Sequence, residues 1–455
     1  MPAPGSRRRG PPAMTTVRRC AAALAASAVL CVALAPAAVA GGDVPAAPGA
    51  SPSADPAPAP SPAESSPAEP APVKIPPGLY GDKDPTYDGV WRQSLAMLGQ
   101  FAAHVRPANQ AVAWLKGQQC ANGAFPAYRP EPARPCDAKT AVDSNSTAAA
   151  IQALSSLGGQ RPAMTRGIAW LRSVQNKDGG WSYAPGTPSD ANSTSLVIGA
   201  MTVAGVRPSS VRSAAGKNAY DALVGLSIPC DTASGADAGG FAYQPDAAGK
   251  LSANDDATTA AVLAGVGKRL VSGPVKAGPA PSCVPAADLS PERAARNGAA
   301  YLASVLAATG HLDQPPMPGA EDSAPLPDIG NTAEAVVSLT ATGYGDQANR
   351  ALEWLKQNSG AWAQENGPAA YAQLILAAHA TDTDPRNFGG IDLVERLNAT
   401  GPAPKAIAVP ASPAAAASTS VDEGGRAVLW LIVIGLVVAG YIGFRISVRG
   451  KTARP

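Results

Sequence analysis

The stretch RGIAWLRSVQNKDGGWSYAPGTPSDANST, residues 166–194, decides the fold, because the chain from about residue 108 to residue 376 contains diverged copies of it. Its parts are a helical segment carrying Trp170, the loop Gly179–Trp181, and the polar run Asp190–Thr194, which opens a second apolar helix. A repeat of roughly 40 to 55 residues that forms one helix pair indicates a solenoid or a closed ring.

Four other copies share an aromatic residue in the first helix and a polar run before the second. These pairs are Trp114 with Asp143–Thr147, Tyr220 with Asn254–Thr258, Tyr301 with Asp328–Thr332, and Trp354 with Glu365–Pro368. In the copy of Trp354, the segment Gly360–Trp362 takes the place of the glycine-aromatic loop.

Apolar helical segments at 88–103 and 391–397 flank the copies, so the pattern predicts twelve helices and no strand. Twelve helices in alternating pairs suit an all-α fold, a closed α/α toroid of about six helix hairpins with six inner and six outer helices. An open solenoid would instead need polar capping repeats at its ends.

Composition and hydropathy divide the chain into six segments. They are a signal peptide at 1–40, an Ala/Pro/Ser-rich disordered linker at 41–74, the toroid ectodomain at 75–400, a flexible Ala/Pro/Ser tether at 401–425, a transmembrane helix at 426–445, and a basic cytoplasmic tail at 446–455. The signal peptide is indicated by Arg18 and Arg19, which precede an apolar run and the small residues ending at Ala40. The linker and the tether contain too few apolar residues to bury a core.

The uncharged apolar run Ala427–Phe444 is at the short end of what crosses a hydrocarbon core. Arg445, Arg449 and Lys451 follow it, and the basic flank of a membrane helix faces the cytoplasm. We therefore expect a single-pass type I protein of the cell membrane, with its main body outside. The formal net charge is only +2, so no nucleic-acid partner is expected.

Four cysteines remain once the signal peptide is removed: Cys120, Cys136, Cys230 and Cys283. An even number in an exported protein indicates two disulfides, with three possible connectivities. We predict that nearest neighbours pair, Cys120 with Cys136 and Cys230 with Cys283. A zinc site is the alternative, but no C-x-x-C pair is present and the chain has only three histidines, so no metal is expected.

The polar runs supply the candidate site. An Asp or Asn before a helix commonly caps it, but capping uses one side chain, and each run carries more polar residues than that. If the helix starts meet at one mouth of the ring, these residues line a polar rim suited to amides, hydroxyls or a cation. The candidate ligand-binding residues are Asp143, Asn145, Asp190, Asn192, Asn254, Asp256 and Asp328, with Tyr183 and Tyr243 from the loops.

The segment Arg166–Trp181, with Trp170, Gln175 and Gly179, resembles the glutamine-tryptophan repeat of the squalene cyclase and prenyltransferase superfamily. Residues 111–125 are similar, and the resemblance extends over roughly residues 86–398. It implies an α/α toroid. It does not by itself imply an activity, since the superfamily includes cyclases, protein prenyltransferases, thioester domains and cobalamin carriers.

The catalytic motifs of that superfamily match poorly here. Class II cyclases use the central Asp of an Asp-x-Asp-Asp-Thr motif as an acid, and the nearest stretch, Asn254–Thr258, lacks the first Asp and has Ala257 inserted before the Thr. The prenyltransferase zinc set and the thioester Cys-Gly-Glu-Gln are also missing from the sequence. No catalytic residue is therefore assigned.

The transcobalamin and intrinsic factor type of carrier is similar in context: exported, disulfide-bonded, toroidal and without catalysis. This resemblance implies a corrinoid as the candidate bound ligand, held by rim residues through its side chains. In those carriers a small β domain closes over the ligand, and this chain has no room for one, so a lid would have to be a separate protein.

The sequence therefore predicts an exported, membrane-anchored, non-catalytic toroid that binds a small molecule at the cell surface, for delivery to a membrane transporter. One alternative is an extracytoplasmic terpene or prenyl-lipid cyclase with Asp255 or Asp256 as acid. A second alternative is a structural or protein-interaction module.

Overall fold

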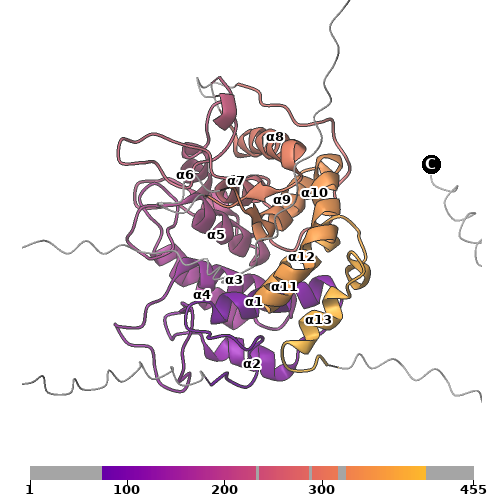
Figure 1. Cartoon of the computed structure of the whole chain (residues 1–455). Coiled ribbons are helices and arrows are strands. Elements are labelled where there is room, and N and C mark those ends of the chain that lie inside the picture. The colour runs from indigo at the N-terminus through magenta and orange to yellow at the C-terminus, as the bar shows by residue number, and fades with distance from the viewer. Residues whose placement is uncertain (1–73, 232–234, 286–288, 316–323, 406–455) are drawn as a thin grey trace, which may run out of the picture. The chain divides into compact units, whose positions relative to one another are not determined.

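The computed structural model describes residues 74–231, 235–285, 289–315 and 324–405 (Figure 1). The expected signal peptide, most of the expected linker, the expected membrane helix at 426–445 and the basic tail lie outside these residues. Within the described ranges, no helix is both long and apolar enough to cross a membrane.

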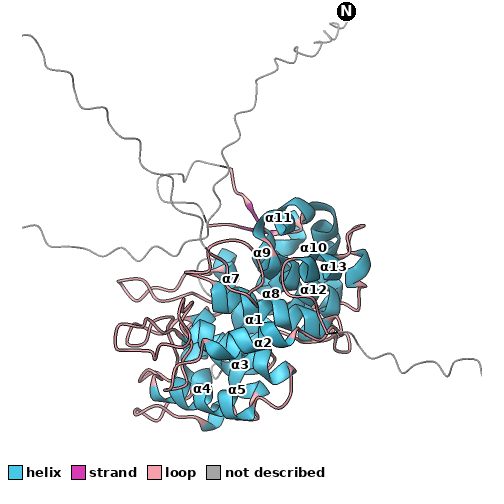
Figure 2. Ribbon diagram, turned by 90° about the horizontal axis from the view of Figure 1, so that it is seen from below, coloured by secondary structure: helices cyan, strands magenta, loops and turns pink. Residues whose placement is uncertain are grey.

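The described residues are mostly helical, which confirms the all-α prediction (Figure 2). The α-helices are α1 (Gly89–Ala102), α2 (Asn109–Gly117), α3 (Ser144–Ser156), α4 (Arg161–Ser173), α5 (Ala191–Val203), α6 (Ala219–Gly225), α7 (Asp255–Gly265), α8 (Pro291–Thr309), α9 (Ile329–Ala341), α10 (Gly345–Asn358), α11 (Gly360–Asn366), α12 (Pro368–Ala380) and α13 (Leu393–Ala399). Short 3-10 helices lie at Pro208–Ser210, Gly235–Asp237 and Pro385–Asn387.

The additional helix is α11, which forms where the sequence predicted a glycine-aromatic loop at Gly360–Trp362. In three other copies the loop turns at a glycine of positive φ: Gly123 (99°), Gly179 (95°) and Gly239 (82°). Gly360 is not among the glycines of positive φ. Without that turn, the run Gly360–Asn366 continues as a helix that ends at Gly367, whose φ is 71°.

The prediction of no strand is also wrong, because β1 (Leu312–Asp313) and β2 (Pro327–Asp328) form a short antiparallel pair. The register pairs Leu312 with Asp328. Phe125 and Asp143 form the same kind of bridge in the first copy. The two strands are therefore the fourth copy's version of this bridge, extended by one further residue pair.

Six of the helices contact one another in a closed cycle: α1, α3, α5, α7, α9 and α12, which packs back on α1. We call them the cycle helices. The other helices lie against them: α2 on α1, α4 on α3, α6 on α5, α8 on α7, α10 on α9, and α11 and α13 on α12 (Figures 1 and 2).

The cycle helices are buried on nearly all sides, because each has neighbours in the cycle and a helix packed outside. Small residues allow this close approach: a Cβ added at Gly99 of α1 would lie 3.0 Å from the Cα of Ala372 in α12. Outer helices such as α10 bury only one stripe, which contains Ala348, Leu352 and Leu355.

A repeated set of hydrogen bonds fixes each loop to the start of the next cycle helix. In the second copy, the Trp181 N–H donates to Thr194 Oγ1 (3.0 Å) and the Asp190 N–H donates to the Trp181 carbonyl (2.9 Å). The N–H groups of Phe125, Phe241 and Leu312 donate in the same way to Thr147, Thr258 and Thr332, at 2.9, 2.9 and 3.0 Å. The loop residues Phe125, Trp181 and Phe241 are buried parts of the architecture, and the threonines that end these four polar runs have a structural role.

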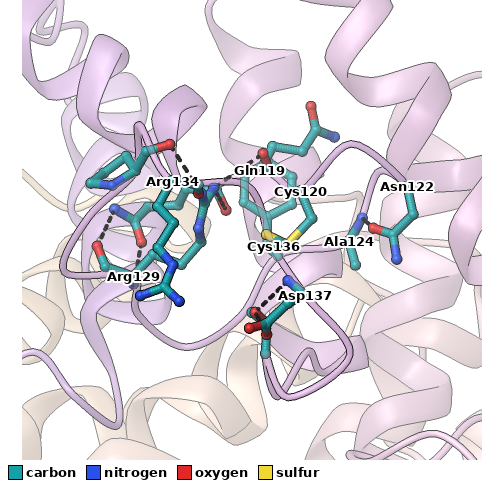
Figure 3. Close-up of a disulfide and its surroundings, with 12 residues drawn as sticks. Gln119, Cys120, Asn122, Ala124, Arg129, Arg134, Cys136 and Asp137 are labelled. Atoms are coloured by element: carbon teal, nitrogen blue, oxygen red, sulfur yellow. Dashed lines mark hydrogen bonds between the residues drawn. A yellow bond between two sulfur atoms is a disulfide. The ribbon is translucent and has the colours of Figure 1, made fainter.

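Both disulfides pair as predicted, Cys120 with Cys136 and Cys230 with Cys283. Figure 3 shows the first of them. Beside it the buried Arg129 guanidinium donates to the carbonyls of Gly117 (3.1 Å) and Pro132 (3.0 Å). This loop is therefore held by a covalent bond and by an arginine that binds backbone oxygens.

Candidate functional site

The starts of the cycle helices lie at one end of the cycle. Neighbouring cycle helices run in the same direction. The Ser144 N–H at the start of α3 donates to the carbonyl of Tyr183 (3.0 Å), in the loop whose Trp181 carbonyl binds the Asp190 N–H at the start of α5. Near the other ends, Ser155 of α3 donates to the Val203 carbonyl at the end of α5 (3.4 Å). We call the end that gathers the helix starts the N-terminal end, and the opposite one the C-terminal end.

Four of the predicted rim residues cap cycle helices. One side-chain oxygen of each accepts a backbone N–H three residues later, an interaction typical of helix N-caps. The pairs are Asp143 with Ser146 (2.6 Å), Asp190 with Ser193 (2.7 Å), Asn254 with Ala257 (2.8 Å) and Asp328 with Asn331 (3.0 Å). The helix-capping role accounts for one polar residue in each run, and the threonine contacts account for another.

The remaining predicted residues lie two positions after a cap: Asn145, Asn192 and Asp256. The Asn192 side-chain N–H donates to the Asp256 carboxylate, which joins α5 to α7. The side-chain oxygens of Asn145 and Asn192 are buried and have no hydrogen-bond partner. Each of these oxygens can therefore accept a hydrogen bond.

Two further residues extend this group, and the sequence did not point to them. Gln373 of α12 donates through Nε2 to Glu334 Oε1 of α9 (3.0 Å). Glu334 lies six residues after the Asp328 cap. Residues four apart share a face of a helix, so Glu334 lies on the same face as the position two residues after that cap, the position that Asn192 and Asp256 occupy in their own helices. We call Asn192, Asp256, Glu334 and Gln373 the acid–amide cluster, which draws one residue from each of four successive cycle helices.

The two carboxyl groups of this cluster have strongly raised pKa values. Burial raises the pKa of Asp256 to about 6, against the hydrogen bond from Asn192, and the charges of Asp328 and Asp190 raise it further. Burial raises the pKa of Glu334 to about 7, with the negative charge of Asp256 as the second cause. Both side chains still keep some surface accessible to solvent.

The neighbouring caps show the same trend. Burial raises the pKa of Asp143 to about 6, and burial also raises the pKa of Asp190 above its usual range, although backbone N–H groups stabilise both anions. No basic side chain is among the causes that shift these four carboxyl groups within the described residues. Among the described residues these four carboxyl groups therefore have no basic partner, whereas Asp88, just before α1, pairs with Arg92 at 3.6 Å.

Asp255 belongs to a different contact from Asp256. The Tyr301 hydroxyl of α8 donates to Asp255 Oδ1 at 2.7 Å, so this carboxylate faces a helix outside the cycle. Burial raises its pKa, and the hydrogen bond from Tyr301 lowers it. Of the two candidate acids, only Asp256 lies in the acid–amide cluster.

The predicted loop tyrosines lie at the same end. The carbonyl of Tyr183 accepts the Ser144 N–H, and the carbonyl of Tyr243 accepts the Ala191 N–H at 3.1 Å, so each loop is fixed to the preceding cycle helix. The two residues remain 47% and 41% exposed, and Tyr87, just before α1, is 86% exposed. Partly exposed aromatic rings thus accompany the carboxylates.

Two recesses in the described structure lie away from the acid–amide cluster. One of about 120 Å³ lies at the C-terminal end, beside Leu98, Gln152 and Val203. The other, of about 470 Å³, lies beside the disulfide of Cys120 and Cys136. Among the described residues, no group of three or more His, Cys, Asp or Glu side chains could hold a metal ion.

No protein-family model matches the sequence, and no curated protein matches it significantly. A solved structure, a sugar epimerase from a ruminal bacterium, is similar to 62% of this chain over 80% of its own length, with 14% identity and a TM-score of 0.40. A likeness this weak carries no argument about function. By its own structure the chain is a mostly helical, disulfide-bonded protein with a half-buried acid–amide cluster.

Proposed function

We propose that this protein is an α/α toroid that binds a small molecule at the N-terminal end of its inner helices. The closed cycle of six helices, each with a helix packed outside it, supports the toroid, as does the resemblance of the Trp170 repeat to the cyclase and prenyltransferase superfamily. Membership of that superfamily remains a proposal.

The observation that carries the binding function is the acid–amide cluster. Asn192 contacts Asp256 and Gln373 contacts Glu334. Burial is the main cause of the raised pKa of Glu334 and the charge of Asp256 is the second, so the two pairs interact as one polar group. Burial raises the pKa of these carboxyl groups towards neutral pH, so their ionisation costs folding free energy. Groups with perturbed pKa values cluster at functional sites.

The chemistry of the cluster sets the class of ligand. Carboxylates and amide oxygens accept hydrogen bonds, and with no compensating cation among the causes of their pKa shifts they favour ligands that bring donors or positive charge. Hydroxyl-rich, amide-bearing and ammonium compounds fit this description. A corrinoid, whose amide side chains are donors, is the member of this class suggested by the resemblance to cobalamin carriers.

The cellular setting completes the proposal. An exported toroid, held at the cell membrane by the tether at 401–425 and the membrane helix at 426–445, would capture such a ligand outside the cell for a membrane transporter. A separate protein could close over the open end. No catalytic step is required.

Thermal unfolding of the full-length protein with a panel of cobalamin, neutral oligosaccharides and polyamines tests this function. A ligand present at about 100 times its Kd adds about 2.7 kcal/mol of stability. We expect one class to stabilise the wild type and to lose its effect in Asp256→Asn, while Asp346→Asn, an exposed acid of α10, serves as the matched control. An unchanged melting curve with every compound would refute ligand binding and favour the structural module.

The raised pKa of Asp256 supports a second candidate, an enzyme of the cyclase type. Between about pH 4 and pH 6, a carboxyl group with a pKa of about 6 keeps a proton that an ordinary aspartate has lost, as a general acid must. Turnover of a polyprenyl substrate by the wild type but not by Asp256→Asn would establish this activity. Turnover that survives the change would exclude Asp256 as the acid.

A further inference from the structure

The segment Val266–Cys283, between α7 and α8, lies across the C-terminal end of the cycle. It contains no regular secondary structure and leaves α7 through a turn at Gly267, whose φ is 66°. We call it the cover segment. Its contacts concern the end of the cycle opposite the acid–amide cluster and are independent of the proposed binding function.

The cover segment reaches the last turns of helices far apart in the cycle. The Leu270 N–H donates to Gln152 Oε1 of α3 at 3.1 Å. The Gly278 N–H donates to the Gly343 carbonyl, just after α9, at 2.8 Å. A Cβ added at Gly273 would lie 3.9 Å from Nε2 of His379, in the last turn of α12.

The remaining contacts surround the small recess at this end. Arg269 and Val271 of the cover segment line it together with Leu98 of α1 and Val203 of α5. Val271 is only 8% exposed and belongs to the main hydrophobic core. The segment leaves α7, hydrogen-bonds to α3 and to the residue just after α9, lies near the end of α12 and shares the recess with α1 and α5, so it lies across the C-terminal end.

The far end of the cover segment has two attachments. Cys283 is bonded to Cys230, which lies after α6, and both cysteines are partly exposed. The next residue, Val284, is held by Asn297 of α8, which accepts its N–H at 3.0 Å and donates to its carbonyl at 3.2 Å. Few backbone hydrogen bonds hold the middle of the segment, and segments of that kind open locally before the rest of a domain unfolds.

We propose that the cover segment is a lid over the C-terminal end of the cycle, kept shut by the Cys230–Cys283 disulfide. An external dithiol opens it: the dithiol gives two electrons and two protons to the two sulfur atoms and becomes a disulfide, while Cys230 and Cys283 become thiols. The opened lid uncovers the floor of the small recess, which includes Leu98 of α1 and Val203 of α5.

Limited trypsin digestion of the full-length protein measures the lid directly, because Arg269 and Lys276 are exposed on it. In Cys230→Ser/Cys283→Ser we expect cleavage after these residues to accelerate by about tenfold or more, since the variant loses the cross-link. The matched control is Cys120→Ser/Cys136→Ser, which removes the other disulfide and leaves the lid cleavage unchanged. Asn297→Ala, which keeps the disulfide, accelerates it less.

Hydrogen exchange in the same variants separates an opening lid from general loosening. The lid account predicts faster exchange in residues 266–283 and unchanged exchange in the middle of α3 and α12. Equal acceleration in those helices, or cleavage no faster than in the wild type, overturns the proposal. If the double cysteine variant does not fold, the folded wild type is treated with a dithiol and read by the same two measurements.

Discussion

The substitution Glu334→Gln has the clearest expected effect, because it removes a charge from the acid–amide cluster with almost no change of shape. The amide oxygen of the new side chain can still accept the hydrogen bond from Gln373. The variant therefore isolates the cost of ionising Glu334 in the folded state.

The size of that cost follows from the pKa. The folded protein raises the pKa of Glu334 from its ordinary 4.5 to about 7, chiefly by burial and by the charge of Asp256. Each pKa unit corresponds to about 1.36 kcal/mol, so ionisation costs the folded state up to about 3 kcal/mol.

The sign of the pH dependence is then fixed. A carboxyl group whose pKa is raised by folding contributes no penalty below its unfolded pKa, and the penalty grows as pH rises from about 4.5 to about 7. We expect the variant and the wild type to be about equally stable at pH 4.5, and the variant to be more stable by about 2 to 3 kcal/mol at pH 8.

Urea unfolding with both disulfides intact, followed by circular dichroism at pH 4.5 and pH 8, measures this difference. Asp346→Asn is the control, because it neutralises an exposed acid of α10 outside the cluster. A Glu334→Gln variant that is less stable than the wild type at pH 8, or a difference that does not change with pH, would refute the assignment of Glu334 as a buried, destabilising acid.

Three further changes test the architecture around the cluster. Thr258→Val leaves the buried Phe241 N–H without its acceptor and should cost about 1 to 3 kcal/mol in urea unfolding, whereas the exposed Thr165→Val on α4 should cost little. Gly179→Ala places a Cβ 2.2 Å from the Asn218 carbonyl oxygen at a φ of 95°, so we expect a lower melting temperature; the open Gly186→Ala, at a φ of 88°, shows the backbone strain alone. Cys120→Ser/Cys136→Ser should lose about 2 to 4 kcal/mol of unfolding free energy, and a melting curve equal to that of the wild type would contradict a structural role for this bridge.

Local features of the sequence predicted much of this structure. The tryptophan and glycine of each copy and the Asp or Asn before each second helix act within a few residues, so helix pairs, caps and loops could be placed from the sequence. The even number of cysteines indicated two disulfides, and both pair between nearest neighbours as predicted. The sequence did not predict α11, because whether Gly360 makes a turn depends on its backbone angles, and its φ is not positive.

The candidate site was predicted only in part. Asn192 and Asp256 stood out because they lie in polar runs, but Glu334 and Gln373 are single polar residues in the middle of apolar helices. Glu334 and Gln373 are 39 residues apart in the chain, and their contact depends on the packing of α9 against α12. No local pattern encodes which side chains face one another across a closed cycle.

The central claim is that the acid–amide cluster contacts the ligand. Carbodiimide labelling of carboxyl groups at pH 6, read by mass spectrometry with and without the compound that raises the melting temperature most, tests it directly. The account predicts that Asp256 and Glu334 are protected by the ligand, by about fivefold or more if nine-tenths of the protein is bound, while Asp346 is labelled equally in both samples. Equal labelling of Asp256 and Glu334 with and without the bound compound would contradict it.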